Sequence, residues 1–79
     1  MNKIEILKKL NDIFIDVFEN EEILISETTE CGDLDDWDSL NHIHLVVAIE
    51  KIFEIRFTTL EISIWKNIGD LINSIETKL

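Results

Sequence analysis

The sequence predicts an all-α fold, a small antiparallel four-helix bundle with a long loop between the first and second helices and a short third helix. Apolar residues recur at helical spacings in stretches that begin at capping residues. Residues 52–57 alternate like a strand, but no second strand is available to pair with them. The 79 residues contain no proline and only two glycines, and 46% are hydrophobic, which is enough for one core. We therefore expect a single domain over residues 1–79.

The first predicted helix runs from about Asn2, a suitable N-cap, to about Glu19. Its apolar stripe consists of Leu7, Leu10, Phe14, Val17 and Phe18. The next stretch, residues 20–37, has no sustained periodicity, so we expect a long loop. A few hydrophobic anchors, Leu24 and Leu34, should hold this loop to the core. Loops of this kind inside small domains are uncommon and are usually functional.

The second predicted helix begins at Asp38 or Ser39 and ends at Phe53, with the Asp38 carboxylate as its cap. A helical wheel gives it a core stripe of Leu45, Val46, Ile49, Ile52 and Phe53. A second apolar strip, on the side of Ser39, consists of Leu40, Ile43 and Val47. This strip predicts either a docking surface or a central helix that buries both sides against the long loop and the short helix.

Two shorter helices are predicted in the last third of the chain. Thr58 and Thr59 offer caps for a short third helix that reaches about Lys66. Asn67 should cap the last helix, and Asp70, three positions later, should complete an arrangement like a capping box. The residues of this helix that should face inward are Ile68, Leu71, Ile72 and Ile75.

The charge of the chain is concentrated in one segment. There are 17 acidic and seven basic side chains, which give a formal net charge of −10. Residues 19–38 contain nine of the carboxylates and no Lys or Arg. Nucleic acid is disfavoured as a partner because no basic stripe faces its phosphates, and a basic protein partner is favoured. The alternative is a solvated loop that is acidic only for solubility.

Several classes of site and location are disfavoured. The single cysteine, Cys31, cannot close an internal disulfide, which fits a reducing cytoplasm. The longest apolar run, residues 45–49, is far shorter than the roughly 20 residues that span a bilayer, so no membrane partner is expected. His42 and His44 point to different sides of a helix, and the acidic loop lacks the pattern of an EF-hand, so no metal site is expected. Ser39 and His42 could approach each other, but so small a bundle can scarcely build an oxyanion hole and a cleft, so we expect no catalytic residues. His42 should instead pack at the edge of the core.

The second helix opens with the triplet Asp38-Ser39-Leu40 and closes with Ile49-Glu50-Lys51-Ile52-Phe53. A long acidic loop precedes it, and Asn67-Ile68-Gly69-Asp70-Leu71 starts the last helix. In these positions and separations the chain resembles the acyl carrier protein family, in which an Asp-Ser-Leu triplet opens the second helix of a four-helix bundle. The resemblance extends to chain length and acidity.

The resemblance implies that Ser39 accepts 4′-phosphopantetheine from coenzyme A, transferred by a separate magnesium-dependent phosphopantetheinyl transferase. The thiol of that arm would hold an acyl or related group as a thioester, and the chain itself would catalyse nothing. Asp38 would help the transferase to position its metal and nucleophile. The contacts gripped by partner enzymes would be Leu40, Ile43 and Val47. The implied partners of this monomeric, cytoplasmic carrier are that transferase and acyl-loading and acyl-using enzymes with basic docking patches.

Some residues depart from the pattern of carriers for fatty-acid synthesis. Part of the acidic charge that is usual on the second helix is replaced by Asn41, His42, His44 and Lys51. Together with Trp37 before Asp38, this is similar to free-standing carriers of specialised pathways, such as polyketide, peptide-like or saccharide-modifying assembly. Trp65 either fills volume that a long acyl chain would occupy, which predicts a small acyl cargo, or is simply a core aromatic residue. The other function class that fits the sequence is an unmodified acidic adaptor or inhibitor that binds a basic protein partner.

Overall fold

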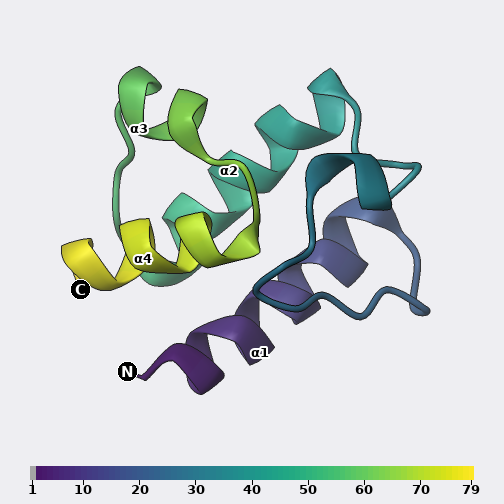
Figure 1. Cartoon of the computed structure of the whole chain (residues 1–79), viewed down its shortest axis with the longest axis horizontal. Helices are drawn as coiled ribbons and strands as arrows, with labels where there is room; N and C mark the ends of the chain where they lie inside the picture. The colour runs from purple at the N-terminus through teal and green to yellow at the C-terminus, as the bar shows by residue number, and fades with distance from the viewer. Residues whose placement is uncertain (1) are drawn as a thin grey trace.

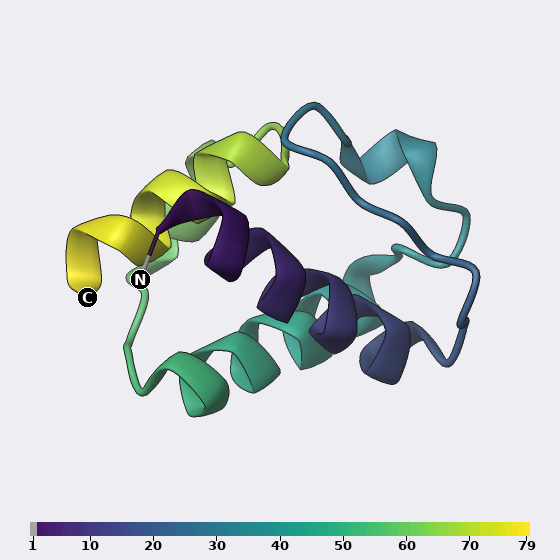
Figure 2. The same ribbon diagram turned by 90° about the horizontal axis from the view of Figure 1, so that it is seen from below.

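The computed structural model describes residues 2–79, and its fold is an all-α bundle, as predicted. Its α-helices are α1 (Lys3–Phe18), α2 (Ser39–Phe53), α3 (Thr59–Ile64) and α4 (Ile68–Lys78). Within residues 2–79 there is no extended strand, only an isolated bridge between Glu30 and Asn67. Figure 1 shows the long loop on one side of the molecule and α3 on the other. In Figure 2, α1 crosses α2 and α4 and runs antiparallel to both.

The ends of α1 and α2 lie within one residue of the predicted ones. Asn2 Oδ1 accepts a hydrogen bond from the backbone N–H of Glu5 at 2.9 Å, which caps α1. Both helices end at a glutamate in the left-handed region, Glu19 with φ of 53° and Glu54 with φ of 56°. A non-glycine residue is uncommon there, but it lets the chain turn sharply out of the helix.

The caps of α3 and α4 also follow the sequence, with one shift. Thr58 and Glu61 form a complete capping box at the start of α3. Asn67 Oδ1 accepts from the N–H of Asp70 at 3.0 Å, as predicted for α4. The Asp70 carboxylate, however, accepts from the N–H of Lys66 at 2.9 Å rather than from that of Asn67, so the predicted box closes one residue earlier. This bond holds the chain just after α3, which ends at Ile64.

The core lies where α1, α2 and α4 meet. Its nearly inaccessible side chains include Ile6, Leu10, Phe14, Leu45, Ile49, Ile68, Leu71, Ile72 and Ile75. The inward face predicted for α4 is therefore confirmed. In α1, the predicted stripe residues Leu7 and Val17 are only half-buried, because Ile6 and Ile13 take the central positions.

The prediction that Ile52 belongs to the core stripe of α2 was wrong. Its side chain is 53% exposed. It lies at the outer edge of the contact between α1 and α2, next to the polar residues Lys9, Asp12 and Asp16 of α1. No other element covers that edge among residues 2–79, so the wheel made the buried face wider than the packing allows.

The predicted loop anchor Leu24 was also wrong, whereas Leu34 does pack against the core. Leu24 is 86% exposed, and its neighbours Ile23 and Ile25 are buried instead. The side chain of Asn11 explains the reversal, because it accepts from the N–H of Ile25 at 2.8 Å and donates to the carbonyl of Ile23 at 3.3 Å. This pairing turns the side chains on either side of Leu24 inward and leaves Leu24 in solvent.

The rest of the loop is tied to α4. The backbone N–H of Ile68 donates to the carbonyl of Thr29 at 2.9 Å, and that of Gly69 donates to Glu27 at 2.8 Å. A short 3-10 helix, η1 (Cys31–Asp33), then leads toward α2, a turn that the sequence analysis did not predict. The loop is thus anchored to α1 near its start and to the start of α4 near its middle.

The corrected anchors give a matched pair of stability predictions. Ile25→Ala should lower the free energy of unfolding by about 2–4 kcal/mol, because it removes a buried side chain and leaves a cavity. Leu24→Ala should change it by no more than about 0.5 kcal/mol, since that side chain lies in solvent. Urea denaturation of the two variants measures the difference. Equal losses would contradict the assignment of Ile25 as the anchor.

Candidate functional site

Ser39 is the first residue of α2 and its side chain is exposed. Asp38 caps the helix, because its Oδ1 atom accepts from the N–H of Asn41 at 2.8 Å. Asn41 in turn donates from its side chain to the carbonyl of Asp36 at 2.7 Å, which fixes the loop to the first turn of α2. The cap that the sequence predicted at Asp38 is confirmed, and it leaves the Ser39 side chain at the surface.

A cluster of aromatic side chains packs the residue before Asp38 against α1 and α2. The ring of Trp37 packs edge-on against Phe14 of α1, with 5.1 Å between ring centroids, and tilts against Phe18 at 6.2 Å. The Trp37 indole N–H also donates to His42 Nδ1 at 3.1 Å. His42 is half-buried at the edge of the core, as predicted. The residue before Asp38 is therefore fixed to both α1 and α2.

The second apolar strip of α2 is exposed. Leu40 is 62% exposed, Ile43 59% and Val47 48%. Of the two interpretations that the sequence left open, burial against the loop and α3 does not hold for these side chains. They form an apolar face that starts next to Ser39 and continues along α2, the kind of surface that a partner protein can cover.

A cleft of about 650 Å³ opens beside Ser39, between the first half of α2 and the segments around α3 and the start of α4. Its volume is that of a small-molecule site. Ser39 and Asp38 line it together with core residues Leu45 and Leu71, and Ile62 and Trp65 line it from the α3 side. Trp65 could be singled out from the sequence, but the cleft could not, because its walls come from segments that are distant in sequence.

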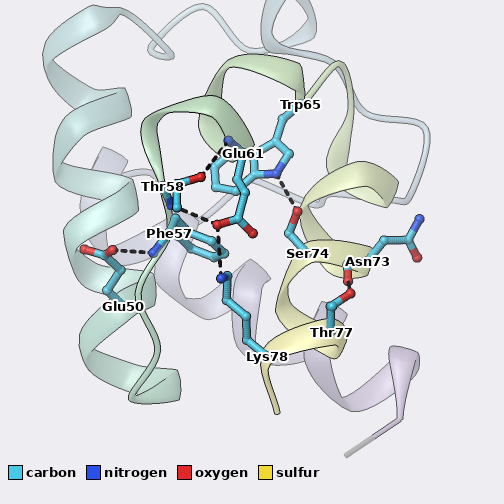
Figure 3. Close-up of polar contacts among 9 residues, drawn as sticks. All are labelled: Glu50, Phe57, Thr58, Glu61, Trp65, Asn73, Ser74, Thr77 and Lys78. Carbon is cyan, nitrogen blue, oxygen red and sulfur yellow. Dashed lines mark hydrogen bonds and ion pairs between the residues drawn. The ribbon is translucent and has the colours of Figure 1, made fainter.

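The short helix α3 contains no buried residue, and polar contacts hold it to its neighbours (Figure 3). Lys78 of α4 pairs with the Glu61 carboxylate at 3.0 Å. The Trp65 indole N–H donates to Ser74 Oγ of α4 at 2.8 Å. The Glu50 carboxylate accepts from the N–H of Phe57 at 2.9 Å and so fixes the segment between α2 and α3.

Glu61 gives the stability of the fold a predicted pH dependence. The hydrogen bond from the Thr58 backbone N–H and then Lys78 hold the pKa of Glu61 below its ordinary value of 4.5. Because the pKa is lower in the folded state, the ionised form stabilises the fold above about pH 4.5, and this contribution is lost as the pH falls through the folded value. Glu61→Gln should therefore lower Tm at pH 7 and have less effect at pH 3.

Thermal denaturation at the two pH values measures this effect. Glu22→Gln is the matched control, because it removes one negative charge from an exposed loop position that has no ion pair with any of residues 2–79. A Glu61→Gln deficit that stays constant between pH 7 and pH 3 would contradict the proposed role of the Glu61 carboxylate.

Three further observations concern metal ligands, the cysteine and membrane-spanning helices. Among the residues that the structure describes, no three His, Cys, Asp or Glu side chains are grouped so that they could hold a metal ion. Cys31 is exposed near the same cleft, with its sulfur 3.5 Å from the carbonyl oxygen of Trp37. None of the helices within residues 2–79 has both the length and the apolar character needed to cross a membrane.

Comparisons with known proteins point to one family. A solution NMR structure of holo acyl carrier protein from Geobacter metallireducens superposes with a TM-score of 0.86 and is 38% identical in sequence. The match covers 91% of this chain and 83% of that chain. No protein-family model and no curated protein matches the chain. With this identity over most of both chains, the protein belongs to the acyl carrier protein family, whose members are carriers and not enzymes.

Proposed function

We propose that this protein carries acyl or related intermediates as thioesters on a 4′-phosphopantetheine arm attached to Ser39. The observation that carries the proposal is the exposed position of Ser39, at the start of α2 and on the rim of a cleft, in a chain similar to a holo acyl carrier protein. The resemblance to specialised carriers supports a role outside housekeeping fatty-acid synthesis. An unmodified acidic adaptor is the alternative outcome of the test below.

The residues around Ser39 fit a phosphodiester at that position. The Asp38 side chain uses the N–H of Asn41, and the first intrahelical bond uses that of His42. The N–H groups of Ser39 and Leu40 therefore have no partner within the helix, and together with the helix dipole they favour an anion. The carboxylates of the loop oppose the same anion, but they lie in solvent, where water and salt screen them.

The arm supplies a thiol on which an acyl group is held as a thioester. In its attachment, Ser39 Oγ forms a bond to phosphorus and loses its proton, while the nucleotide half of coenzyme A leaves. Asp38 precedes Ser39 in the chain and lines the same cleft, and one of its carboxylate oxygens accepts from Asn41, so the other would be available to the metal ion of the transferase. Asp38 is thus a positioning residue in this proposal, and the transferase provides the catalytic groups.

Partner enzymes would dock on the apolar face of α2 and the acidic loop before it. Leu40, Ile43 and Val47 provide exposed apolar contacts along one helix. The segment 19–38 has nine carboxylates and no Lys or Arg, which would attract the transferase and the acyl-loading and acyl-using enzymes if they carry basic patches. Since Asn41 and Lys51 reduce the acidity of α2 itself, most of this attraction would come from the loop.

Intact-mass spectrometry tests the proposal. The protein is incubated with coenzyme A, Mg²⁺ and a phosphopantetheinyl transferase of broad specificity, and one phosphopantetheinyl group should be added per chain. Proteolytic fragments should locate the added mass on Ser39. If the wild-type protein is folded by circular dichroism and still gains no mass, the proposal is wrong and the adaptor function is favoured.

A further inference from the structure

Two hollows in the surface of the molecule meet at Trp65. The first is the cleft beside Ser39, and the second is a groove between α3 and α4. Their lining residues have only Trp65 and Lys66 in common. The two differ in character, because the cleft reaches the core at Leu45 and Leu71, whereas the groove is lined mainly by polar side chains such as Glu61 and Asn73. Trp65 therefore forms a wall that the cleft and the groove share.

The indole of Trp65 is held in this position from two sides. Its N–H donates to Ser74 Oγ of α4 at 2.8 Å, as Figure 3 shows. Its ring packs edge-on against Phe57, with ring centroids 4.8 Å apart and an interplanar angle of 86°. The backbone next to it is fixed as well, because the N–H of Lys66 donates to the Asp70 carboxylate. Any movement of the indole out of the cleft would break the bond to Ser74 and the contact with Phe57.

We infer that Trp65, positioned by Ser74, limits the cargo of this carrier to compact acyl groups; the inference rests on the proposed attachment at Ser39. A compact group fits the apolar part of the cleft without moving the indole. A long linear chain that extends past the cleft would have to displace Trp65, which would break its bond to Ser74 and its contact with Phe57. Trp65 is thus a specificity-determining residue, and Ser74 is its positioning residue.

Acyl groups of increasing length test the inference. The transferase is supplied with butyryl-, octanoyl- or palmitoyl-coenzyme A, and intact mass confirms that each acyl arm is attached before any further measurement. The readout is Tm relative to the protein with the unacylated arm. In the wild type, butyryl should raise Tm by about 4 °C, the shift that a small domain shows for a modest gain in stability. Palmitoyl should raise Tm no more than butyryl does.

Variants of Trp65 and Ser74 provide the second part of the experiment. Trp65→Ala should open the way between the two hollows, so that octanoyl and palmitoyl raise Tm more than butyryl. Ser74→Ala should change the dependence of Tm on acyl length in the same direction, because the indole loses its hydrogen bond but keeps its volume. Thr59→Ala is the control, since Thr59 is an exposed residue that also loses a hydroxyl but lines neither the cleft nor the groove. Its profile should equal that of the wild type.

The possible results separate the inference from the proposed function. A wild-type Tm that rises steadily through palmitoyl would overturn the inference, as would an unchanged profile in Ser74→Ala and Trp65→Ala. If Trp65→Ala does not fold, Ser74→Ala decides alone, because it leaves the apolar packing in place. Absence of any mass gain would refute the attachment at Ser39 and the inference with it, whereas normal loading with the wrong length profile would refute the inference only.

Discussion

Ser39→Ala is expected to abolish the addition of phosphopantetheine while leaving the fold intact. The hydroxyl of residue 39 is the proposed nucleophile, so the gain in mass should fall from one group per chain to none. The fold should survive because the helix cap is the Asp38 carboxylate, and Ser39 is an exposed residue in the first turn. A serine-to-alanine change at such a position alters the free energy of unfolding by about 0.5 kcal/mol or less.

Ser63→Ala is the matched control for this experiment. Ser63 is also an exposed serine on a helix, and its hydroxyl bonds only the carbonyl of Leu60. This variant should be modified like the wild type. A mass gain that persists in Ser39→Ala and disappears in a variant of another serine would show that the arm is attached to that other serine. A loss of Tm in Ser39→Ala of more than a few degrees would show that residue 39 has a structural role.

The helix boundaries could be predicted because their determinants are local. Asn2, Asp38 and Asn67 each accept a hydrogen bond from an N–H three residues further on, and this spacing can be read in the sequence. Ser39 was recognised instead through the resemblance to acyl carrier proteins, in which an Asp-Ser-Leu triplet opens the second helix; the helical wheel added only the apolar strip beside it. The wheel could not decide whether that strip was covered, because this depends on where α3 and the loop lie.

The errors of the sequence analysis arose where burial is decided by distant residues. Leu24 and Ile25 are adjacent and both apolar, and the bonds from the distant Asn11 side chain to the backbone of Ile23 and Ile25 hold Ile25 toward the core. Ile52 is exposed because nothing within residues 2–79 packs on the outer edge of α1 and α2. The cleft beside Ser39 needed the same kind of information, since the Trp65–Ser74 bond that fixes one wall joins separate elements. Residue type alone carries no signal for such a contact.

Phe14→Ala is expected to be the most destabilising of the substitutions considered. The ring is inaccessible to solvent and packs against Phe18 at 5.3 Å and Trp37 at 5.1 Å. Removing a buried phenylalanine costs about 3–5 kcal/mol, which approaches the whole stability of a domain of this size. Urea denaturation should show a large fall in the transition midpoint, and Phe14→Leu should show a smaller one.

The same substitution should also affect the functional site. Phe14 packs against Trp37, and Trp37 bonds His42, which lies about one helical turn after Ser39 on α2. In the folded fraction of Phe14→Ala, phosphopantetheine addition should therefore be slower than in the wild type. Ile72→Ala is the control, since it also makes a cavity in the core but lies on α4, whereas the rings that contact Trp37 belong to α1 and α2. If both variants are modified equally fast at equal folded fractions, Phe14 stabilises the fold without positioning the loop.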